Sequence, residues 1–146
     1  MIQQLEADGI QLQFDNRVIL SDVYLSCAKG SIIGLLGRNG SGKSCLLQVI
    51  FGSLSCEKSI RINRVSFNEA YKNQSLISYL PQFHFIPNSL SLKDIFEVYA
   101  LDYSIFELQF PSFHIPINQT FKNLSGGEKR LIEIYIIVES TTQFAL

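Results

Sequence analysis

The feature that most constrains this chain is a glycine-rich segment of eight residues that fits the pattern G-x-x-x-x-G-K-[ST]. Its glycines let successive backbone N–H groups point inward and form a nest for an anion. The apolar run Ser31–Leu36 before it is typical of a strand buried on both faces. The segment Lys43–Phe51 after it is predicted to be a helix, whose positive end would face the same anion. The eight residues are Gly37, Arg38, Asn39, Gly40, Ser41, Gly42, Lys43 and Ser44.

The last two residues of this segment bring the chemistry of a nucleoside triphosphate site. Lys43 places a point charge on the β- and γ-phosphates, and Ser44 offers its hydroxyl to Mg²⁺. A glycine-rich structural turn is the alternative interpretation. The predicted strand before the segment and helix after it are the context that the phosphate-binding motif requires. We therefore predict a phosphate loop (P-loop) that binds a nucleoside triphosphate.

Composition and charge exclude several other classes of protein. The 146 residues are 47% hydrophobic and 17% charged, which favours one globular domain over a disordered chain. The net charge of −1 gives no global attraction to nucleic acid, so we expect no nucleic-acid partner. No stretch approaches the roughly 20 apolar residues that span a bilayer. The three cysteines form no C-x-x-C pair, and His84 and His114 are interpreted as ordinary surface or core residues.

Hydrophobic periodicity gives a coarse order of elements. Residues 10–14 and 23–27 alternate as strands do and predict an antiparallel layer at the start of the chain. Residues 60–67 and 76–80 are further strand candidates, residues 88–110 carry helical spacing, and residues 126–139 form a strong helical pattern. Residues 144–146 are predicted to begin a strand.

Two later motifs make the chain resemble the ATP-binding cassette (ABC) ATPases over its whole length. Leu80-Pro81-Gln82 ends a predicted strand 38 residues after Ser44, in the position of that family's Q-loop. Leu124-Ser125-Gly126-Gly127-Glu128 is similar to the LSGGQ-type signature. The resemblance implies an α/β P-loop NTPase fold with an N-terminal antiparallel β layer. It divides the chain into a β layer and P-loop core (1–82), a small helical subdomain (83–123), and the signature with its helix and the start of the Walker B strand (124–146).

The resemblance also assigns roles to residues. Lys43 and Gln82 become catalytic residues, with Ser44 and Gln82 on the Mg²⁺ side of the ATP. The phosphate loop and Cys45, which follows it in the sequence, bind the ATP. Phe14 stacks on the adenine, and a phenylalanine in the core of the strand is the alternative. Cys45 follows Ser44 at a helix start, a position that favours alkylation by maleimides and protection by ATP; a small packed residue is the alternative.

The signature implies a partner. In ABC ATPases, residues such as Ser125, Gly126, Gly127 and Glu128 contact the ATP of an opposite subunit, so a head-to-tail dimer is expected. Glu128 could instead serve only as a favourable charge at a helix start. The short separation of 42 positions from Gln82 to Leu124 argues against the coiled-coil DNA-repair relatives, and the chain contains no N-K-x-D motif of GTP-binding proteins.

Family members continue after the signature helix into a strand that ends in Asp-Glu, which supports Mg²⁺ and polarises the attacking water. From this we expect that the sequence is a C-terminally incomplete cassette, with impaired hydrolysis and, given a mean hydropathy of +0.18, a tendency to aggregate.

The function implied is the ATP-hydrolysing subunit of an ABC transporter, cytoplasmic and attached to membrane-spanning subunits at the inner face of the cell membrane. The alternatives are a truncated, non-hydrolysing nucleotide-binding or interaction module and a soluble ABC protein of translation. The transported substrate and the direction of transport are not encoded in these motifs.

Overall fold

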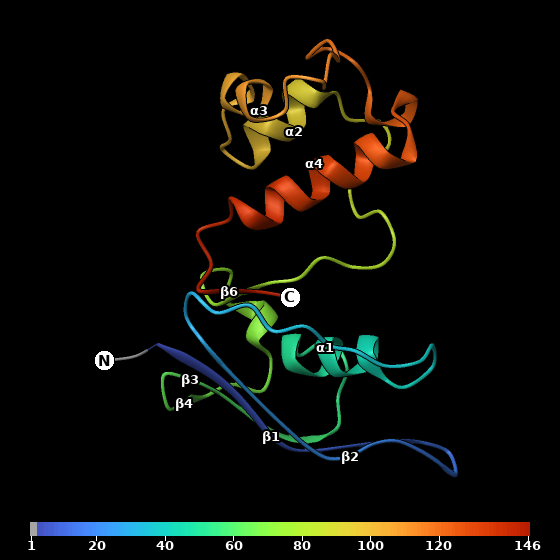
Figure 1. The fold of residues 1–146 in the computed structure, drawn as a ribbon, viewed down its shortest axis with the longest axis vertical. Helices are drawn as coiled ribbons and strands as arrows, with labels where there is room; N and C mark the ends of the chain where they lie inside the picture. The colour runs from blue at the N-terminus through green and yellow to red at the C-terminus, as the bar shows by residue number, and fades with distance from the viewer. Residues whose placement is uncertain (1–2) are drawn as a thin grey trace. The chain divides into compact units, whose positions relative to one another are not determined.

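A computed structural model describes residues 3–146 and divides them into two compact units (Figure 1). The first unit contains residues up to Tyr79 together with Thr141–Leu146, and the second contains Leu80–Ser140. The expected helical subdomain of residues 83–123 stays a prediction. In the structure those residues share a compact unit with the signature helix.

The first unit is built on a four-stranded antiparallel sheet in the order β2-β1-β3-β4. The strands are β1 (Gln4–Phe14), β2 (Arg17–Ala28), β3 (Glu57–Ile62) and β4 (Val65–Ser66). In β1 the buried residues are Leu5 and Ala7 and then, after an irregularity in the register with β2, Ile10 and Leu12. Gly9 lies in this irregularity with a positive φ of 58°, and the extra residue returns the apolar side chains to the core face. The predicted antiparallel layer is confirmed.

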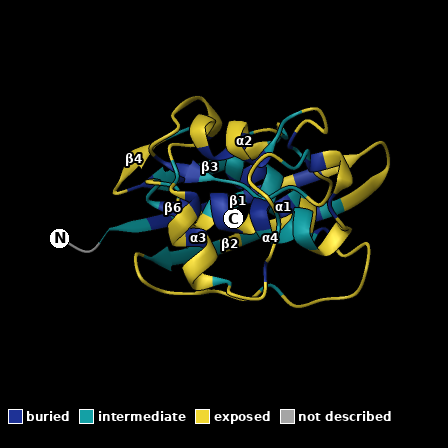
Figure 2. Ribbon diagram, turned by 90° about the horizontal axis from the view of Figure 1, so that it is seen from above, coloured by how far each residue is buried: buried dark blue, intermediate teal, exposed yellow. Residues whose placement is uncertain are grey.

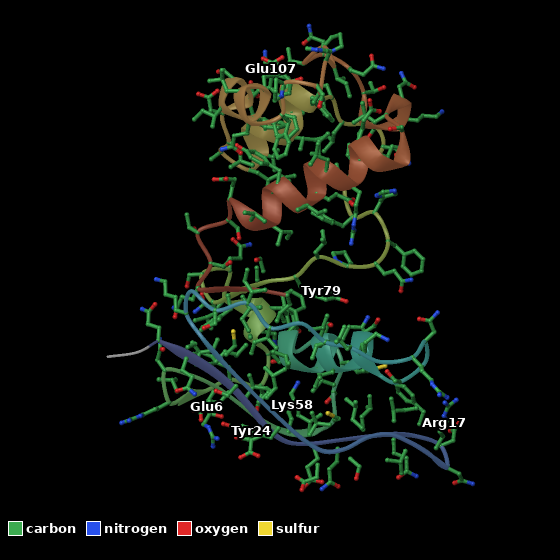
Figure 3. The ribbon with its side chains drawn as sticks, in the orientation of Figure 1. Glu6, Arg17, Tyr24, Lys58, Tyr79 and Glu107 are labelled. Carbon is green, nitrogen blue, oxygen red and sulfur yellow. The ribbon has the colours of Figure 1, made fainter. Side chains whose placement is uncertain are left out.

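Helix α1 (Lys43–Phe51) buries Leu46, Val49 and Ile50 in the core of this unit, while both residues of β4 are exposed (Figure 2). The helix ends at Gly52, whose left-handed φ of 93° lets its N–H donate to the carbonyl of Gln48. Lys58 on β3 reaches the same helix end, because its Nζ donates to the Val49 carbonyl over 2.9 Å (Figure 3). Burial lowers the pKa of the Lys58 ammonium.

The predicted strand at Ser31–Leu36 is not formed, which corrects the sequence-based expectation. Ile32 is 100% exposed and Leu36 is 97% exposed. The two-stranded parallel sheet of this unit pairs β5 (Ile77–Ser78) with β6 (Phe144–Ala145), and a cavity of about 440 Å³ is lined by residues 31–33, Leu35 and 143–146. A strand needs a hydrogen-bonded neighbour, and within residues 3–146 no segment fills the cavity to provide one. The short 3₁₀ helix η1 spans Ala70–Lys72.

The second unit is helical and has a core of aromatic side chains. Its elements are α2 (Leu92–Val98), α3 (Tyr103–Gln109), the 3₁₀ helix η2 (Phe121–Asn123) and α4 (Gly126–Val138). The predicted helical stretch 88–110 is divided at Ala100, which has a φ of 53°. The ring of the fully buried Phe106 contacts the rings of Phe96, Tyr103, Phe110, Phe113 and Tyr135.

The helical pattern predicted for residues 126–139 is confirmed by α4. Within residues 3–146, none of the helices has both the length and the apolar character needed to cross a bilayer.

Candidate functional site

The phosphate loop leads directly into α1, as its sequence predicts. Gly40 and Gly42 adopt positive φ angles of 79° and 88°, which other residues adopt only with strain. Gly42 is the N-cap of α1 and its carbonyl accepts the Leu46 N–H over 2.8 Å. Because glycine has no side-chain oxygen and the first turn contains no acidic residue, the N–H groups and the positive dipole end of α1 are available to an anion.

The Lys43 ammonium lies over this loop. Its Nζ donates to the carbonyl oxygens of Gly37 and Arg38, over 2.7 and 2.8 Å. The side chain therefore folds back along the loop that precedes it, so the charge lies over the glycine-rich turn. An anion held in the turn would compete with these two carbonyls for the ammonium donors.

The β1–β2 hairpin lies beside the loop, because a Cβ on Gly42 would meet Leu20 Cδ2 at 2.9 Å and Ile19 Cγ2 at 3.1 Å. Phe14 stands at the end of β1, paired with Arg17 across the hairpin turn, and 47% of it is exposed. Its ring is not part of the buried core of this unit. The role of Phe14 in stacking on adenine stays a prediction, while the alternative of a buried core phenylalanine is wrong.

The signature residues begin α4 in the second unit. Ser125 is the N-cap: its Oγ accepts the Glu128 N–H over 3.3 Å, and its own N–H donates to the Glu128 carboxylate over 2.6 Å. This reciprocal pair is a capping box. The hydrogen bonds from Ser125 lower the pKa of Glu128. Gly126 and Gly127 are exposed in the first turn.

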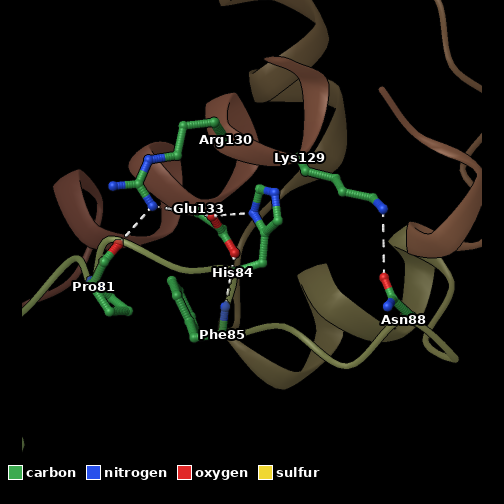
Figure 4. A network of polar contacts seen from close by, with 7 residues as sticks. All are labelled: Pro81, His84, Phe85, Asn88, Lys129, Arg130 and Glu133. Carbon is green, nitrogen blue, oxygen red and sulfur yellow. Dashed lines mark hydrogen bonds and ion pairs between the residues drawn. The ribbon is translucent and has the colours of Figure 1, made fainter. Parts of the chain in front are cut away.

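Gln82 lies exposed on the segment that leads from Pro81 to Ile86, in the same unit as the signature. The residues on both sides of Gln82 are bound to α4 (Figure 4). Arg130 donates to the Pro81 carbonyl over 2.8 Å, and Glu133 accepts from the Phe85 N–H over 2.9 Å. The structure thus places Gln82 and the signature in the same compact unit, and it places the phosphate loop and Phe14 in the other unit.

The capacity of these residues for a metal ion is limited. Ser44 presents an exposed hydroxyl next to Lys43, one hard oxygen ligand of the type that Mg²⁺ accepts. Residues 3–146 contain no group of three His, Cys, Asp or Glu side chains placed to hold a metal. A Mg²⁺ ion at Ser44 would therefore take most of its ligands from phosphate oxygens and water.

Sequence reasoning missed the contacts of His84 and Glu133. Glu133 interrupts an apolar helical run, and its side chain is 0% exposed in the structure. The His84 Nδ1 lies 3.0 Å from the Glu133 carboxylate. A carboxylate on an otherwise apolar face was the available signal, since a buried charge needs partners.

Comparisons with known proteins show what this chain is similar to. Residues 20–146 match the profile of the family described as ABC transporter. The chain is 26% identical to the ABC transporter ATP-binding protein YtrB of Bacillus subtilis, covering 90% of this chain and 47% of that protein. It is 30% identical to a probable ABC transporter ATP-binding protein of Azorhizobium caulinodans, covering 97% of this chain and 56% of that protein. The chain thus spans about half the length of the curated relatives it matches.

Solved structures show the same fold. A putative ABC transporter ATP-binding protein from Pyrococcus furiosus superposes with a TM-score of 0.80 at 20% identity, over 97% of this chain and 73% of that one. An ATP-bound bacterial Atm1-family ABC exporter superposes with a TM-score of 0.79 at 18% identity, over 99% of this chain and 29% of that one. The α/β fold class predicted from the sequence is confirmed.

Proposed function

This chain belongs to the ABC transporter family, and on that premise we propose that it is the ATP-binding part of a transporter subunit that hydrolyses ATP to drive transport. The observation that carries the proposal is the phosphate loop, where the Lys43 ammonium lies over the glycine-rich turn and the start of α1 carries no acidic residue. Such a helix start stabilises a phosphate through its N–H groups and its dipole.

The chain's own residues would act in sequence around the triphosphate. Lys43 exchanges the Gly37 and Arg38 carbonyls for phosphate oxygens, and the glycine-rich turn wraps the phosphates with backbone N–H groups. Mg²⁺, when bound, neutralises charge on the phosphates. The hydroxyl of Ser44, next to Lys43, would be its ligand from the phosphate loop. Gln82 would act on the Mg²⁺ and attacking-water side of the γ-phosphate.

We assign the signature to a second ATPase subunit in a head-to-tail dimer, with Ser125, Gly126 and Gly127 toward the partner's ATP. Exposure of these three residues at the start of α4 supports this assignment. Membrane-spanning transporter subunits would hold the protein at the inner face of the membrane. Relatives named for hemin import and zinc import support a role in transport without identifying the substrate of this chain.

For a protein of these 146 residues we propose ATP binding with slow hydrolysis. The sequence contains no adjacent Asp-Glu pair to support Mg²⁺ and polarise the attacking water. Loss of a general base lowers a rate by about 10²–10⁴-fold.

The test is to measure ATP affinity and turnover for the wild type, Lys43→Gln and Lys29→Gln. We expect Lys43→Gln to weaken ATP binding by roughly 10- to 150-fold, because a hydrogen bond to a charged group contributes about 1.5–3 kcal/mol. Lys29 is exposed and lies outside the loop, so Lys29→Gln is the matched control. Equal affinities for all three proteins would refute ATP binding at this loop. Sustained turnover that Lys43→Gln abolishes would refute slow hydrolysis.

A further inference from the structure

Glu133 is a buried carboxylate with three partners, all in the second unit. Its Oε1 accepts the Phe85 N–H over 2.9 Å, and its Oε2 lies 3.0 Å from His84 Nδ1 and 3.3 Å from an Arg130 guanidinium nitrogen. The side chain is 0% exposed, whereas those of His84 and Arg130 are 45% and 34% exposed. The partners therefore reach inward to a carboxylate fixed on α4 (Figure 4).

The network surrounds one short segment. Arg130 bridges Glu133 and the Pro81 carbonyl, and Glu133 itself binds His84 and Phe85. Gln82 stands between these attachment points and is itself exposed. Three residues after Phe85, Asn88 has a longer contact with α4, since its Oδ1 lies 3.5 Å from Lys129 Nζ.

Packing stability alone gives no reason for a charge at this position. Replacing a buried ion pair by apolar residues of similar volume is often neutral or stabilising, because burial removes both charges from water. A buried carboxylate gives something that an apolar side chain does not, namely directional hydrogen bonds that fix the groups around it. Here those bonds fix the backbone and side chains on both sides of Gln82.

We propose that Glu133 is a positioning residue that holds Gln82 on the signature helix, an inference that rests on the proposed ATP site. Ser125 caps α4 eight residues before Glu133, a rise of roughly 12 Å along the helix axis. A helix is stiff over two turns, so a displacement of the signature end moves the Gln82 segment with it. The two segments proposed to contact ATP then respond as one body.

The first experiment needs no nucleotide. Amide hydrogen exchange is measured on the 146-residue protein for the wild type, Glu133→Leu, Glu133→Gln and the control Glu107→Gln. Glu107 is an exposed carboxylate on α3 in the same unit. Glu133→Leu removes all three contacts and keeps the volume, so we expect the Phe85 amide to exchange at least about tenfold faster while α4 stays protected.

Glu133→Gln keeps an acceptor for Phe85 but loses the charge facing Arg130, so it should give an intermediate rate. If Glu133→Leu also speeds the exchange of the α4 amides, the Glu133→Gln variant decides the question. An unchanged Phe85 exchange rate in a variant whose α4 is intact would overturn the proposal.

The second experiment tests whether Glu133 acts through Gln82. The factor by which Mg²⁺ strengthens ATP binding is measured for the wild type, Gln82→Ala, Glu133→Leu and the double variant. We expect each single change to lower this factor by roughly tenfold, as residues that support a ligand site do, and the double change to lower it no further. Loss of stability would weaken ATP binding with and without Mg²⁺ alike and leave the factor unchanged.

The outcomes separate the two proposals. If the double variant lowers the Mg²⁺ factor by the product of the two single effects, Glu133 does not position Gln82. The same conclusion follows if Glu133→Leu leaves the Mg²⁺ factor unchanged. If the wild type binds no ATP at all, the proposed function fails, and the exchange of the Phe85 amide still decides whether Glu133 holds the segment.

Discussion

Gly42 shows in one residue why the phosphate loop requires glycine. Its φ is +88°, and a Cβ would lie 2.9 Å from Leu20 Cδ2, 3.1 Å from Ile19 Cγ2 and 3.3 Å from the Ile19 carbonyl oxygen. A left-handed backbone costs an L-residue about 1–2 kcal/mol. An extra methyl group in a closed contact costs about 1–3 kcal/mol more. We therefore expect Gly42→Ala to lower the free energy of unfolding by about 2–5 kcal/mol.

Gly40 in the same loop is the matched control. Its φ is +79°, and among residues 3–146 nothing lies within 4 Å of the place of its Cβ. Gly40→Ala should therefore cost only the backbone part, about 1–2 kcal/mol. The assay is urea unfolding followed by far-ultraviolet circular dichroism without nucleotide, and the difference between the two variants measures the close contact with β2.

Equal losses of stability in Gly42→Ala and Gly40→Ala would refute the reasoning. A third variant identifies the contact: because Leu20 Cδ2 is the nearest atom, Leu20→Ala should relieve part of the cost of Gly42→Ala. We expect a coupling free energy between the two changes of about 0.5–3 kcal/mol.

Three further predictions address the helix starts and the exposed surface. Ser125 lowers the pKa of Glu128, so the capping box should stabilise α4 above the unfolded carboxyl pKa of about 4.3 and lose this effect as the pH falls through the lower folded pKa. Unfolding of Glu128→Gln should lack that part of the acid dependence, and identical pH profiles would contradict it. Cys45 should be alkylated by N-ethylmaleimide more slowly in the presence of ATP, as read by mass spectrometry, whereas equal labelling would exclude ATP from its surroundings. Replacing Ile32 and Leu36 by serine should reduce self-association in sedimentation velocity, because both are almost fully exposed; an unchanged distribution of species would show that they do not drive it.

The sequence was most informative where function depends on short, contiguous motifs. The phosphate loop, the helix that follows it and the signature helix could all be predicted, because their backbone conformations and caps are set by neighbouring residues. The capping box of Ser125 and Glu128 is one example, since both partners lie within one helical turn.

Prediction failed where structure depends on distant partners. The apolar run Ser31–Leu36 has the composition of a buried strand, yet a strand also needs a neighbour to complete its hydrogen bonds, and composition does not reveal whether one is present. The contact of His84 with Glu133 joins residues 49 positions apart. The sequence shows an acidic residue in an apolar helix but cannot show what faces it.

The two helix starts proposed to contact ATP, those of α1 and α4, differ in how readily they can accept a phosphate. At the phosphate loop, Lys43 is bound to two neutral carbonyls, which a phosphate displaces with a gain in charge pairing. At the signature, the N–H of Ser125 is already bound to the Glu128 carboxylate, whose charge has the same sign as a phosphate. A phosphate approaching α4 must share the helix start with that carboxylate or displace it. ATP binding to a single chain should therefore precede closure onto the proposed second subunit, because the first step needs only the loop and the second brings a phosphate close to the Glu128 carboxylate.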